Sequence, residues 1–278
     1  MANTKIVFFS DLHYAPERPI NNGSIIERKL MEYSQPLLQK LIHKINEEIK
    51  PDLIINLGDL IEDFNDHDKD IVNLTYIWNE FKKFKYPFYS CIGNHDLRCM
   101  TSRKEVEHIM EYAHSTFSFD INGIHIVILG TDVNNNMGRE AGGILKTQFI
   151  SKEDLEWLEK DLNENELPTI VCVHFGIAED NMKGNWWFES SPKDALLANR
   201  KEVKAILKNK ENIISVFSGH QHWTKHIEED GIEYHILGSM TENINDDGIP
   251  DGVYFIAEFD GESLEIIEKH IRLENNNV

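Results

Sequence analysis

The fold is decided by the stretch Lys5-Ile6-Val7-Phe8-Phe9-Ser10-Asp11-Leu12-His13, in which a short apolar run leads directly into an Asp-x-His pair. A continuous apolar run of this length predicts a buried strand over residues 5–10. In extended backbone, residues two apart point the same way, so Asp11 and His13 share one face. We therefore expect a buried strand that presents two ligand-type side chains at its carboxyl end.

Strand and helix patterns alternate over the first two thirds of the chain, which indicates βαβ units. Short apolar runs predict further strands at residues 53–57, 88–92, 124–129 and 169–173. Apolar residues at helical spacing predict helices near residues 34–49, 71–84, 102–113 and 151–162. Ser102 and Glu105 predict a capping box at the start of the third helix.

The C-terminal third is rich in strand patterns instead. Four tightly connected runs predict strands at residues 213–217, 224–228, 232–237 and 252–259. No linker of low complexity separates this part from the rest. We expect a single domain over residues 1–273 and a disordered tail at residues 274–278.

Charge limits the classes of partner. The 278-residue chain has 48 acidic and 28 basic side chains, so its formal charge is −20. This sign disfavours duplex nucleic acid and acidic membrane surfaces, because lysine and arginine supply most of the affinity for polyphosphates. No apolar run approaches the ~20 residues that a membrane-spanning helix needs. We expect neither a duplex nucleic acid nor a membrane as partner.

Two further features indicate a cytoplasmic protein. The apolar run after the N-terminus is too short for a signal peptide. The cysteines, Cys91, Cys99 and Cys172, lack Cys-x-x-Cys spacing and cannot all pair, which fits a reducing compartment.

Five short polar motifs stand directly after predicted strands. They are Asp11-Leu12-His13, Gly58-Asp59, Gly93-Asn94-His95-Asp96, Val173-His174 and Gly219-His220-Gln221-His222. In open α/β sheets, loops at the carboxyl ends of strands gather around one crevice, so we expect the motifs to converge. Carboxylate, amide and imidazole ligands without thiolate suit manganese, iron or zinc, and a carboxylate that reaches two ions allows a metal pair.

Together, in this order, the motifs resemble those of the calcineurin-like metallophosphoesterase superfamily, from about residue 5 to about residue 260. The pattern is most similar to class III cyclic nucleotide phosphodiesterases and to manganese-dependent ADP-ribose/CDP-alcohol diphosphatases. The resemblance implies a mixed α/β (α+β) fold, a four-layer α/β/β/α sandwich with two packed mixed sheets flanked by helices. It also implies two divalent transition metal ions, Mn²⁺ first, with Fe or Zn as alternatives.

The same resemblance implies a ligand set. The first ion would take Asp11, His13, Asp59 and His222, and the second would take Asp59 as a bridge together with Asn94, His174 and His220. His95 would lie beside the leaving oxygen. Serine/threonine protein phosphatases carry Gly-Asn-His-Glu where this chain has Asp96, and purple acid phosphatases carry an iron-binding tyrosine where it has Glu62, so both sister families are disfavoured.

The expected mechanism follows from this ligand set. A hydroxide bridging the two ions is the nucleophile, because the ions lower the pKa of bound water. His95 is the candidate catalytic acid, and Asp96 the candidate catalytic carboxylate that orients it. A turn carboxylate that caps the following segment is the alternative for Asp96.

Three side chains are candidates for substrate binding, each with a structural alternative. Trp187, in the loop with Trp186 and Phe188, is a candidate nucleobase platform, since stacking on a base contributes ~1–3 kcal/mol. Packing of the loop is the alternative. Tyr14 is a candidate for the pocket lining or a structural tyrosine, and Arg98 is a candidate for a second phosphate or a surface residue.

These features predict a metal-dependent phosphoric ester hydrolase. The first expectation is a phosphodiesterase of a small nucleotide-type phosphoester, resembling cyclic nucleotide phosphodiesterases. The alternatives are a pyrophosphatase of nucleoside diphosphate-X compounds such as ADP-ribose, or a broad phosphomonoesterase. A metal-free interaction scaffold is the non-enzymatic alternative, and the filled ligand positions count against it. The oligomeric state stays open.

Overall fold

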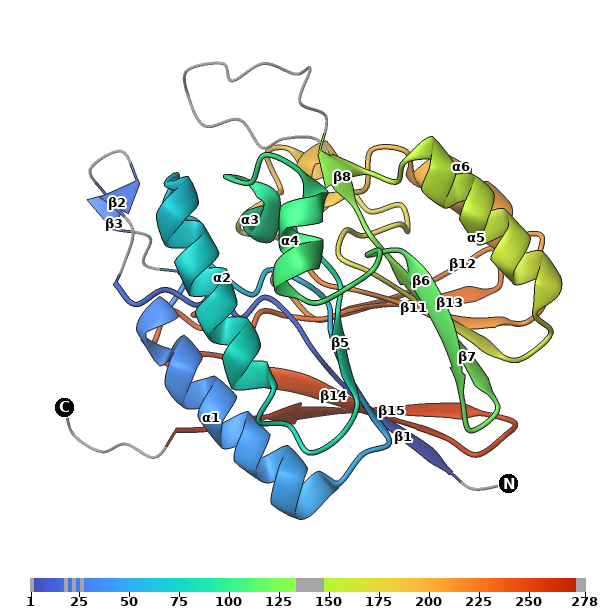
Figure 1. Cartoon of the computed structure of the whole chain (residues 1–278), viewed down its shortest axis with the longest axis horizontal. Coiled ribbons are helices and arrows are strands. Elements are labelled where there is room, and N and C mark those ends of the chain that lie inside the picture. Colours follow the sequence, from blue (N-terminus) through green and yellow to red (C-terminus); the bar gives the residue numbers. More distant parts are fainter. Residues whose placement is uncertain (1–2, 18–19, 22–23, 26–27, 134–147, 274–278) are drawn as a thin grey trace.

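The computed structural model describes residues 3–17, 20–21, 24–25, 28–133 and 148–273 of the chain. Two mixed β-sheets lie between two groups of helices, with α1 and α2 on one side and α5 and α6 on the other (Figure 1). The first sheet has five strands, in the order β15 (Leu264–His270), β14 (Val253–Phe259), β1 (Thr4–Phe9), β4 (Leu53–Asn56) and β5 (Phe88–Ser90). The predicted tail at 274–278 lies outside the described residues.

The second sheet has six strands. Their order is β12 (Lys225–Glu229), β13 (Ile232–Ile236), β11 (Ile213–Ser218), β10 (Thr169–Val173), β7 (Ile124–Leu129) and β6 (Phe117–Ile121). The helices are α1 (Ser34–Lys44), α2 (His67–Phe81), α3 (Asn94–Leu97), α4 (Arg103–Ile109), α5 (Lys152–Glu164) and α6 (Arg200–Leu207). Two small strand pairs are also present, β2 (Ile20–Asn21) with β3 (Ser24–Ile25) and β8 (Asp132–Val133) with β9 (Gln148–Phe149). Three short helical segments, Met31–Tyr33, Ile45–Ile49 and Pro192–Ala195, complete the described elements.

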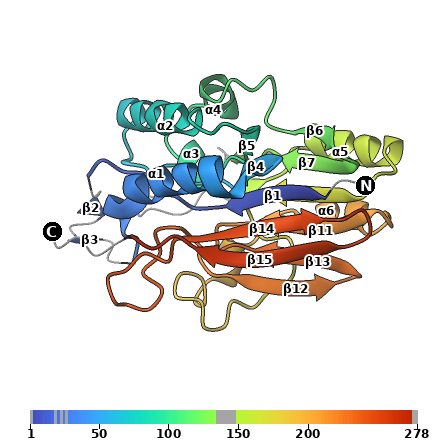
Figure 2. The same cartoon turned by 90° about the horizontal axis from the view of Figure 1, so that it is seen from below.

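Strand β1 explains why four layers form. It pairs with β14 in antiparallel and with β4 in parallel orientation, and Figure 2 shows β1, β14 and β15 side by side. Its alternate residues belong to different clusters: Ile6 and Phe8 pack between the sheets, while Val7 and Phe9 pack towards the helices. The Phe8 ring stacks on Phe217 of β11 at a centroid distance of 4.0 Å. A strand buried on both faces has this continuous apolar sequence.

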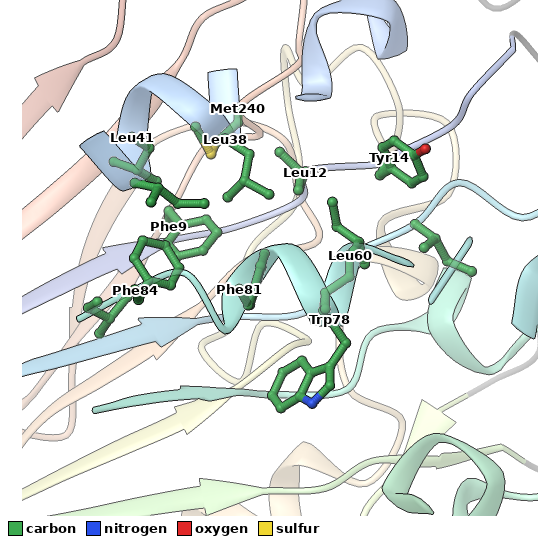
Figure 3. Packing of buried hydrophobic residues seen from close by; sticks show 14 of the residues in the cluster. Phe9, Leu12, Tyr14, Leu38, Leu41, Leu60, Trp78, Phe81, Phe84 and Met240 are labelled. Atoms are coloured by element: carbon green, nitrogen blue, oxygen red, sulfur yellow. The ribbon is translucent and has the colours of Figure 1, made fainter. Parts of the chain in front are cut away.

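Helices cover the outer faces of both sheets. Phe9 packs with Leu38 and Leu41 of α1 and with Phe81 of α2 (Figure 3). On the other side, residues of β7, β10 and β11 pack against Leu158 of α5 and Val203 of α6. The predicted four-layer sandwich of two mixed sheets flanked by helices is therefore confirmed.

Local details of the prediction were less accurate. The predicted capping box at Ser102 is wrong: Ser102 precedes α4 without a side-chain capping bond. The Glu105 carboxylate instead accepts hydrogen bonds from the backbone and hydroxyl of Thr101, at 2.9 and 2.6 Å. The sequence patterns also missed β6, β15 and α6. Within the described residues, no helix is long and apolar enough to cross a membrane.

His125 of β7 provides a test of how charge stabilises this fold. Its Nδ1 lies 2.6 Å from Asp120 and its Nε2 lies 2.8 Å from Asp161. Burial opposes the charged ring, but hydrogen bonds to Asp161 and Asp120 raise the pKa of His125 above its usual value. The resulting stabilisation is complete below the unfolded pKa, near 6.5, and is lost as pH rises through the folded pKa.

We therefore expect His125→Gln to destabilise the protein more at about pH 5.5 than at about pH 9. After solvent screening, the difference in the free energy of unfolding should be about 0.5 kcal/mol. Urea unfolding at both pH values measures it. The control is His108→Gln, which alters an exposed histidine of α4. An equal loss for His125→Gln at both pH values would contradict the prediction.

Candidate metal centre

The five polar motifs meet at one end of the two sheets. Asp11 follows β1, Asp59 follows β4 and Asn94 follows β5 in the first sheet, while His174 follows β10 and His220 follows β11 in the second. Ligand-type atoms of Asp11, His13 and His222 lie within 4.8 Å of one another, and those of Asp59, His174 and His220 do the same. The predicted convergence of the motifs is therefore confirmed.

Most of these residues have an unusual backbone conformation. The φ angles of Asp11, His13, Asp59, His220 and His222 lie between 47° and 67°, in the left-handed region that residues other than glycine rarely adopt. Such strain concentrates at functional sites, where the surrounding structure holds the residue in place. Here the five residues with this backbone conformation belong to the two groups of ligand-type side chains.

The first group is built around two facing imidazoles. The Nε2 atoms of His13 and His222 are only 2.9 Å apart. Asp11 Oδ1 lies 3.4 Å from Nε2 of His222 and 3.8 Å from Nε2 of His13. All three side chains are buried.

The second group shares Asp59 with the first. Asp59 Oδ2 lies 3.4 Å from His174 Nε2 and 3.8 Å from His13 Nε2, so the same oxygen faces both groups. His174 Nε2 is also 3.2 Å from the amide oxygen of Asn94. The His220 ring lies 5.1 Å from the His174 ring and stacks on Phe175 at 3.8 Å.

The outward nitrogens of the four imidazoles are occupied. His222 Nδ1 donates a hydrogen bond to Glu242 at 2.9 Å, and His13 Nδ1 lies 2.9 Å from Glu62. Backbone carbonyl oxygens take the other two: His174 Nδ1 donates to Leu57 at 2.8 Å and His220 Nε2 donates to Asp194 at 3.0 Å. Each ring therefore turns its second nitrogen inward, which is the usual arrangement around a metal ion.

Two observations show that this donor set fits metal ions. Asp59 Oδ2 is buried and has no hydrogen-bond partner among the described residues. The inward nitrogens of His13 and His222 face each other, and two such lone pairs repel unless a cation or a proton lies between them. Carboxylate, amide oxygen and imidazole ligands without thiolate suit divalent transition metals.

The pKa values agree with this account. Burial opposes the charged form of His222, but hydrogen bonds to Asp11 and Glu242 raise its pKa to about 9. Burial and the nearby Lys29 ammonium lower the pKa of His13 to about 4. Burial likewise opposes the charge of His174, and Asp59 raises its pKa to about 9. In the absence of metal, protons thus occupy part of the space between these groups, and metal ions must displace them.

Comparison with known proteins identifies the family. Residues 4–224, more than half of the chain, match the model of the calcineurin-like phosphoesterase family. The chain belongs to the calcineurin-like phosphoesterase family. It is a metal-dependent phosphoester hydrolase of a family that binds metal pairs.

Curated relatives resemble most of this phosphoesterase. A protein from Arabidopsis thaliana named manganese-dependent ADP-ribose/CDP-alcohol diphosphatase is 23% identical over 265 residues, which cover 81% of this chain and 80% of the relative. A protein of the same name from Oryza sativa subsp. japonica is 22% identical and covers 84% of this chain and 82% of its own.

Solved structures share the fold. A dimetal phosphatase from Danio rerio superimposes with a TM-score of 0.72 over 96% of both chains, at 14% identity. A purple acid phosphatase from yellow lupin has a TM-score of 0.64, at 13% identity, over 97% of this chain and 52% of its own.

The structure corrects the expected partner of His95 in the phosphoesterase. Asp96 does not orient it, because the Asp96 carboxylate accepts hydrogen bonds from the backbone N–H groups of Gly93, Asp59 and Leu60 at 2.9–3.0 Å. Asp63 Oδ1 instead lies 2.6 Å from His95 Nδ1. Asp96 thus has the capping role that was its alternative, and it holds the loop that carries Asp59.

The three candidate substrate residues lie in different environments. Tyr14 is buried beside Leu12 and Leu60 (Figure 3) and stacks on Tyr76, which favours its structural alternative. Arg98 lies at the metal centre, with Nη1 2.7 Å from Asp63 and Nη2 3.4 Å from His95 Nε2.

Trp187 contacts the metal centre through Glu242. Its Nε1 donates a hydrogen bond to Glu242 at 3.1 Å, and its ring meets His222 edge-on at 5.5 Å. The neighbouring Trp186 is 62% exposed. Trp187 is therefore fixed against the metal centre, whereas Trp186 presents its ring to solvent.

Sequence reasoning missed the site roles of four buried charges, namely Lys29, Glu62, Asp63 and Glu242. None belongs to a recognisable motif, and Glu242 lies 20 residues after the histidine that it contacts. These residues reach the site only through the tertiary fold, so the local sequence does not identify them. The one local signal was the acidic pair that follows Gly58-Asp59, since Glu62 and Asp63 come only a few residues after a predicted ligand.

Gly93 provides a second test. A Cβ atom on Gly93 would lie 2.0 Å from Asp59 Oδ1 and 2.3 Å from Asp59 N, so alanine must displace Asp59. We expect Gly93→Ala to weaken Mn²⁺ binding by about 10- to 100-fold, as loss of a supporting contact does at other metal sites. Calorimetric titration measures this. The control is Gly238→Ala, whose Cβ meets only side-chain atoms, at 3.1 Å and beyond. Equal Mn²⁺ affinities in the two variants would contradict the prediction.

Proposed function

We propose that this phosphoesterase uses two Mn²⁺ ions to hydrolyse a nucleoside diphosphate linked to a small molecule. One ion would be held by Asp11, His13 and His222 and the other by Asn94, His174 and His220, with Asp59 shared. When bound, such a pair supplies water of lowered pKa and neutralises phosphoryl oxygens. The naming of both plant relatives as manganese-dependent supports Mn²⁺.

The protein's own groups would bind and orient the substrate. His95 lies 4.0 Å from the shared Asp59 oxygen, and this proximity supports a role in assisting the leaving oxygen. Asp63 Oδ1, at 2.6 Å from Nδ1, contacts the other side of the ring. Arg98, paired with the same Asp63, would contact a phosphate beside the metal centre.

The observation that carries the substrate class is a cavity next to His222. It has a volume of about 600 Å³ and is lined by three indole rings, those of Trp186, Trp187 and Trp223. Arg28 lies over the Trp186 ring at 5.3 Å and makes an ion pair with Glu242 at 2.7 Å. Aromatic faces beside a cation suit a base and its phosphate. We assign the role of base platform to Trp186, because Trp187 is engaged by Glu242.

The cavity also supports a substrate larger than a simple phosphate ester. Pockets of 300–1,000 Å³ enclose most of a drug-sized ligand. Both plant relatives are named for ADP-ribose and CDP-alcohols, which are diphosphate-linked. A cyclic nucleotide, with a single phosphate, is the alternative substrate, and the same assay distinguishes the two.

The test is hydrolysis by the Mn²⁺-loaded protein of ADP-ribose, CDP-choline, cyclic AMP and bis-p-nitrophenyl phosphate. We expect the highest kcat/KM for a diphosphate-linked substrate. Trp186→Ala should raise its KM by about 5- to 100-fold, which corresponds to loss of one base stack. Bis-p-nitrophenyl phosphate, which has no base, is the comparison substrate, and Trp186→Ala should leave its KM unchanged. A preference for cyclic AMP, or equal weak turnover of all four, would contradict the proposal.

A further inference from the structure

Lys29 is a buried lysine at the centre of the site. Its side chain is 5% exposed, and its backbone forms an isolated β-bridge with Glu242. Lysine is almost never fully buried unless it is paired. The Lys29 ammonium nitrogen lies 2.8 Å from Glu62 and 5.4 Å from the centre of the Trp187 ring. No sequence motif includes Lys29, and the mechanism above does not use it.

Stability does not explain this placement. A buried ion pair contributes little net stability compared with apolar residues of similar size, because both charges lose their hydration. The Lys29–Glu62 pair therefore requires another reason. Lys29 Nζ also lies 3.2 Å from Nε2 of His95, so the reason we consider is a role beside the candidate catalytic acid.

The Lys29 ammonium has more donors than its own chain uses. It carries three N–H groups, and Glu62 and His95 Nε2 accept two of them. His13 Nδ1 is 3.4 Å away, but it lies closer to Glu62, at 2.9 Å, and itself donates there. Among the described residues, one donor thus remains without an acceptor of its own.

Arg98 approaches the same ring nitrogen from another element. Its Nη2 is 3.4 Å from His95 Nε2, and its Nη1 pairs with Asp63 at 2.7 Å. Two cations, each backed by one of the consecutive carboxylates Glu62 and Asp63, therefore meet at the nitrogen expected to face the substrate. An anion bound beside this nitrogen would contact both cations.

We propose that Lys29 is a catalytic residue that binds a non-bridging oxygen of the reacting phosphoryl group beside His95. This proposal rests on the proposed phosphoester hydrolysis. A fixed donor in a water-poor site costs no reorganisation when charge develops on that oxygen, and loss of one such donor typically lowers kcat by about 10²- to 10³-fold. The rival role is positioning only: Lys29 would hold Glu62, and Glu62 would hold the metal ligand His13.

The test uses the Mn²⁺-loaded full chain with Lys29→Met, which keeps the aliphatic stem but removes the ammonium. Because this leaves Glu62 unpaired, Lys29→Gln, whose amide can still donate to Glu62, is the second variant. Inorganic phosphate is the probe. At saturating Mn²⁺ we expect phosphate affinity to fall by about 10- to 100-fold, as for loss of a charge-assisted hydrogen bond. We expect kcat to fall by about 10²- to 10³-fold and Mn²⁺ affinity to change less than about threefold.

The control is Lys82→Met, which removes a surface lysine paired with Glu111. Unchanged phosphate affinity in a folded Lys29 variant, or a loss that disappears at saturating Mn²⁺, would overturn the proposal and assign Lys29 to positioning. If the wild-type protein binds Mn²⁺ and phosphate but hydrolyses no substrate, the proposed function fails. In that case the phosphate titration still decides whether Lys29 binds a phosphate oxygen at this site.

Discussion

Asp59→Asn should abolish most of the phosphoesterase activity, by about 10³-fold or more in kcat. Asp59 Oδ2 faces both groups of candidate ligands, at 3.4 Å from His174 Nε2 and 3.8 Å from His13 Nε2. Asparagine removes the charge that would be shared between the two ions. Metal ions at such sites contribute several kcal/mol to the transition state, which corresponds to a loss of this size.

The measurement combines activity with the Mn²⁺ stoichiometry of the purified protein. We expect the stoichiometry to fall from two ions towards one or none. The asparagine oxygen can still accept the His95 backbone hydrogen bond that Asp59 Oδ1 accepts at 2.9 Å, so the fold should survive. Asp68→Asn, on the exposed face of α2, is the control. Full activity or two tightly bound ions in Asp59→Asn would exclude Asp59 as the shared ligand.

The features that sequence predicted best are those encoded locally. The β1 run is apolar on both faces because both faces are buried, and this pattern is visible without any tertiary information. The convergence of Asp11 and Asp59 follows from their positions after β1 and β4, since parallel strands end on the same edge of a sheet. Both predictions therefore depend on chain geometry alone.

Side-chain partners could not be predicted in this way. Asp96 was expected beside His95 because the two are neighbours in sequence, but on α3 consecutive side chains diverge and Asp96 turns towards backbone N–H groups. Asp63 reaches His95 from a different loop. Tyr14 follows a candidate ligand by one residue, but its side chain packs in the helical layer and stacks on Tyr76.

His95→Asn should have the second large effect, and the size of the loss should depend on the leaving group. A general acid contributes about 10²- to 10⁴-fold, but only when the departing oxygen needs a proton. For phosphodiesters with an alkoxide leaving group we expect a loss in this range, whereas for a diphosphate-linked substrate, whose phosphate monoester leaving group departs readily as an anion, the loss should be smaller. For a p-nitrophenolate leaving group, which departs readily as an anion, the loss should be less than about tenfold.

The comparison across leaving groups separates two roles that the geometry of His95 allows. Nδ1 faces Asp63 at 2.6 Å, whereas Nε2 faces both Lys29 at 3.2 Å and Arg98 at 3.4 Å. An acid must carry its proton on the nitrogen next to the leaving oxygen, so the substrate must displace these cations from Nε2 as it binds. A steeper dependence on leaving-group basicity in His95→Asn, measured as kcat/KM over a series of aryl and alkyl phosphodiesters, would show that His95 acts as the acid. A uniform loss for all leaving groups would contradict the acid role, because His95 would then only orient the phosphate.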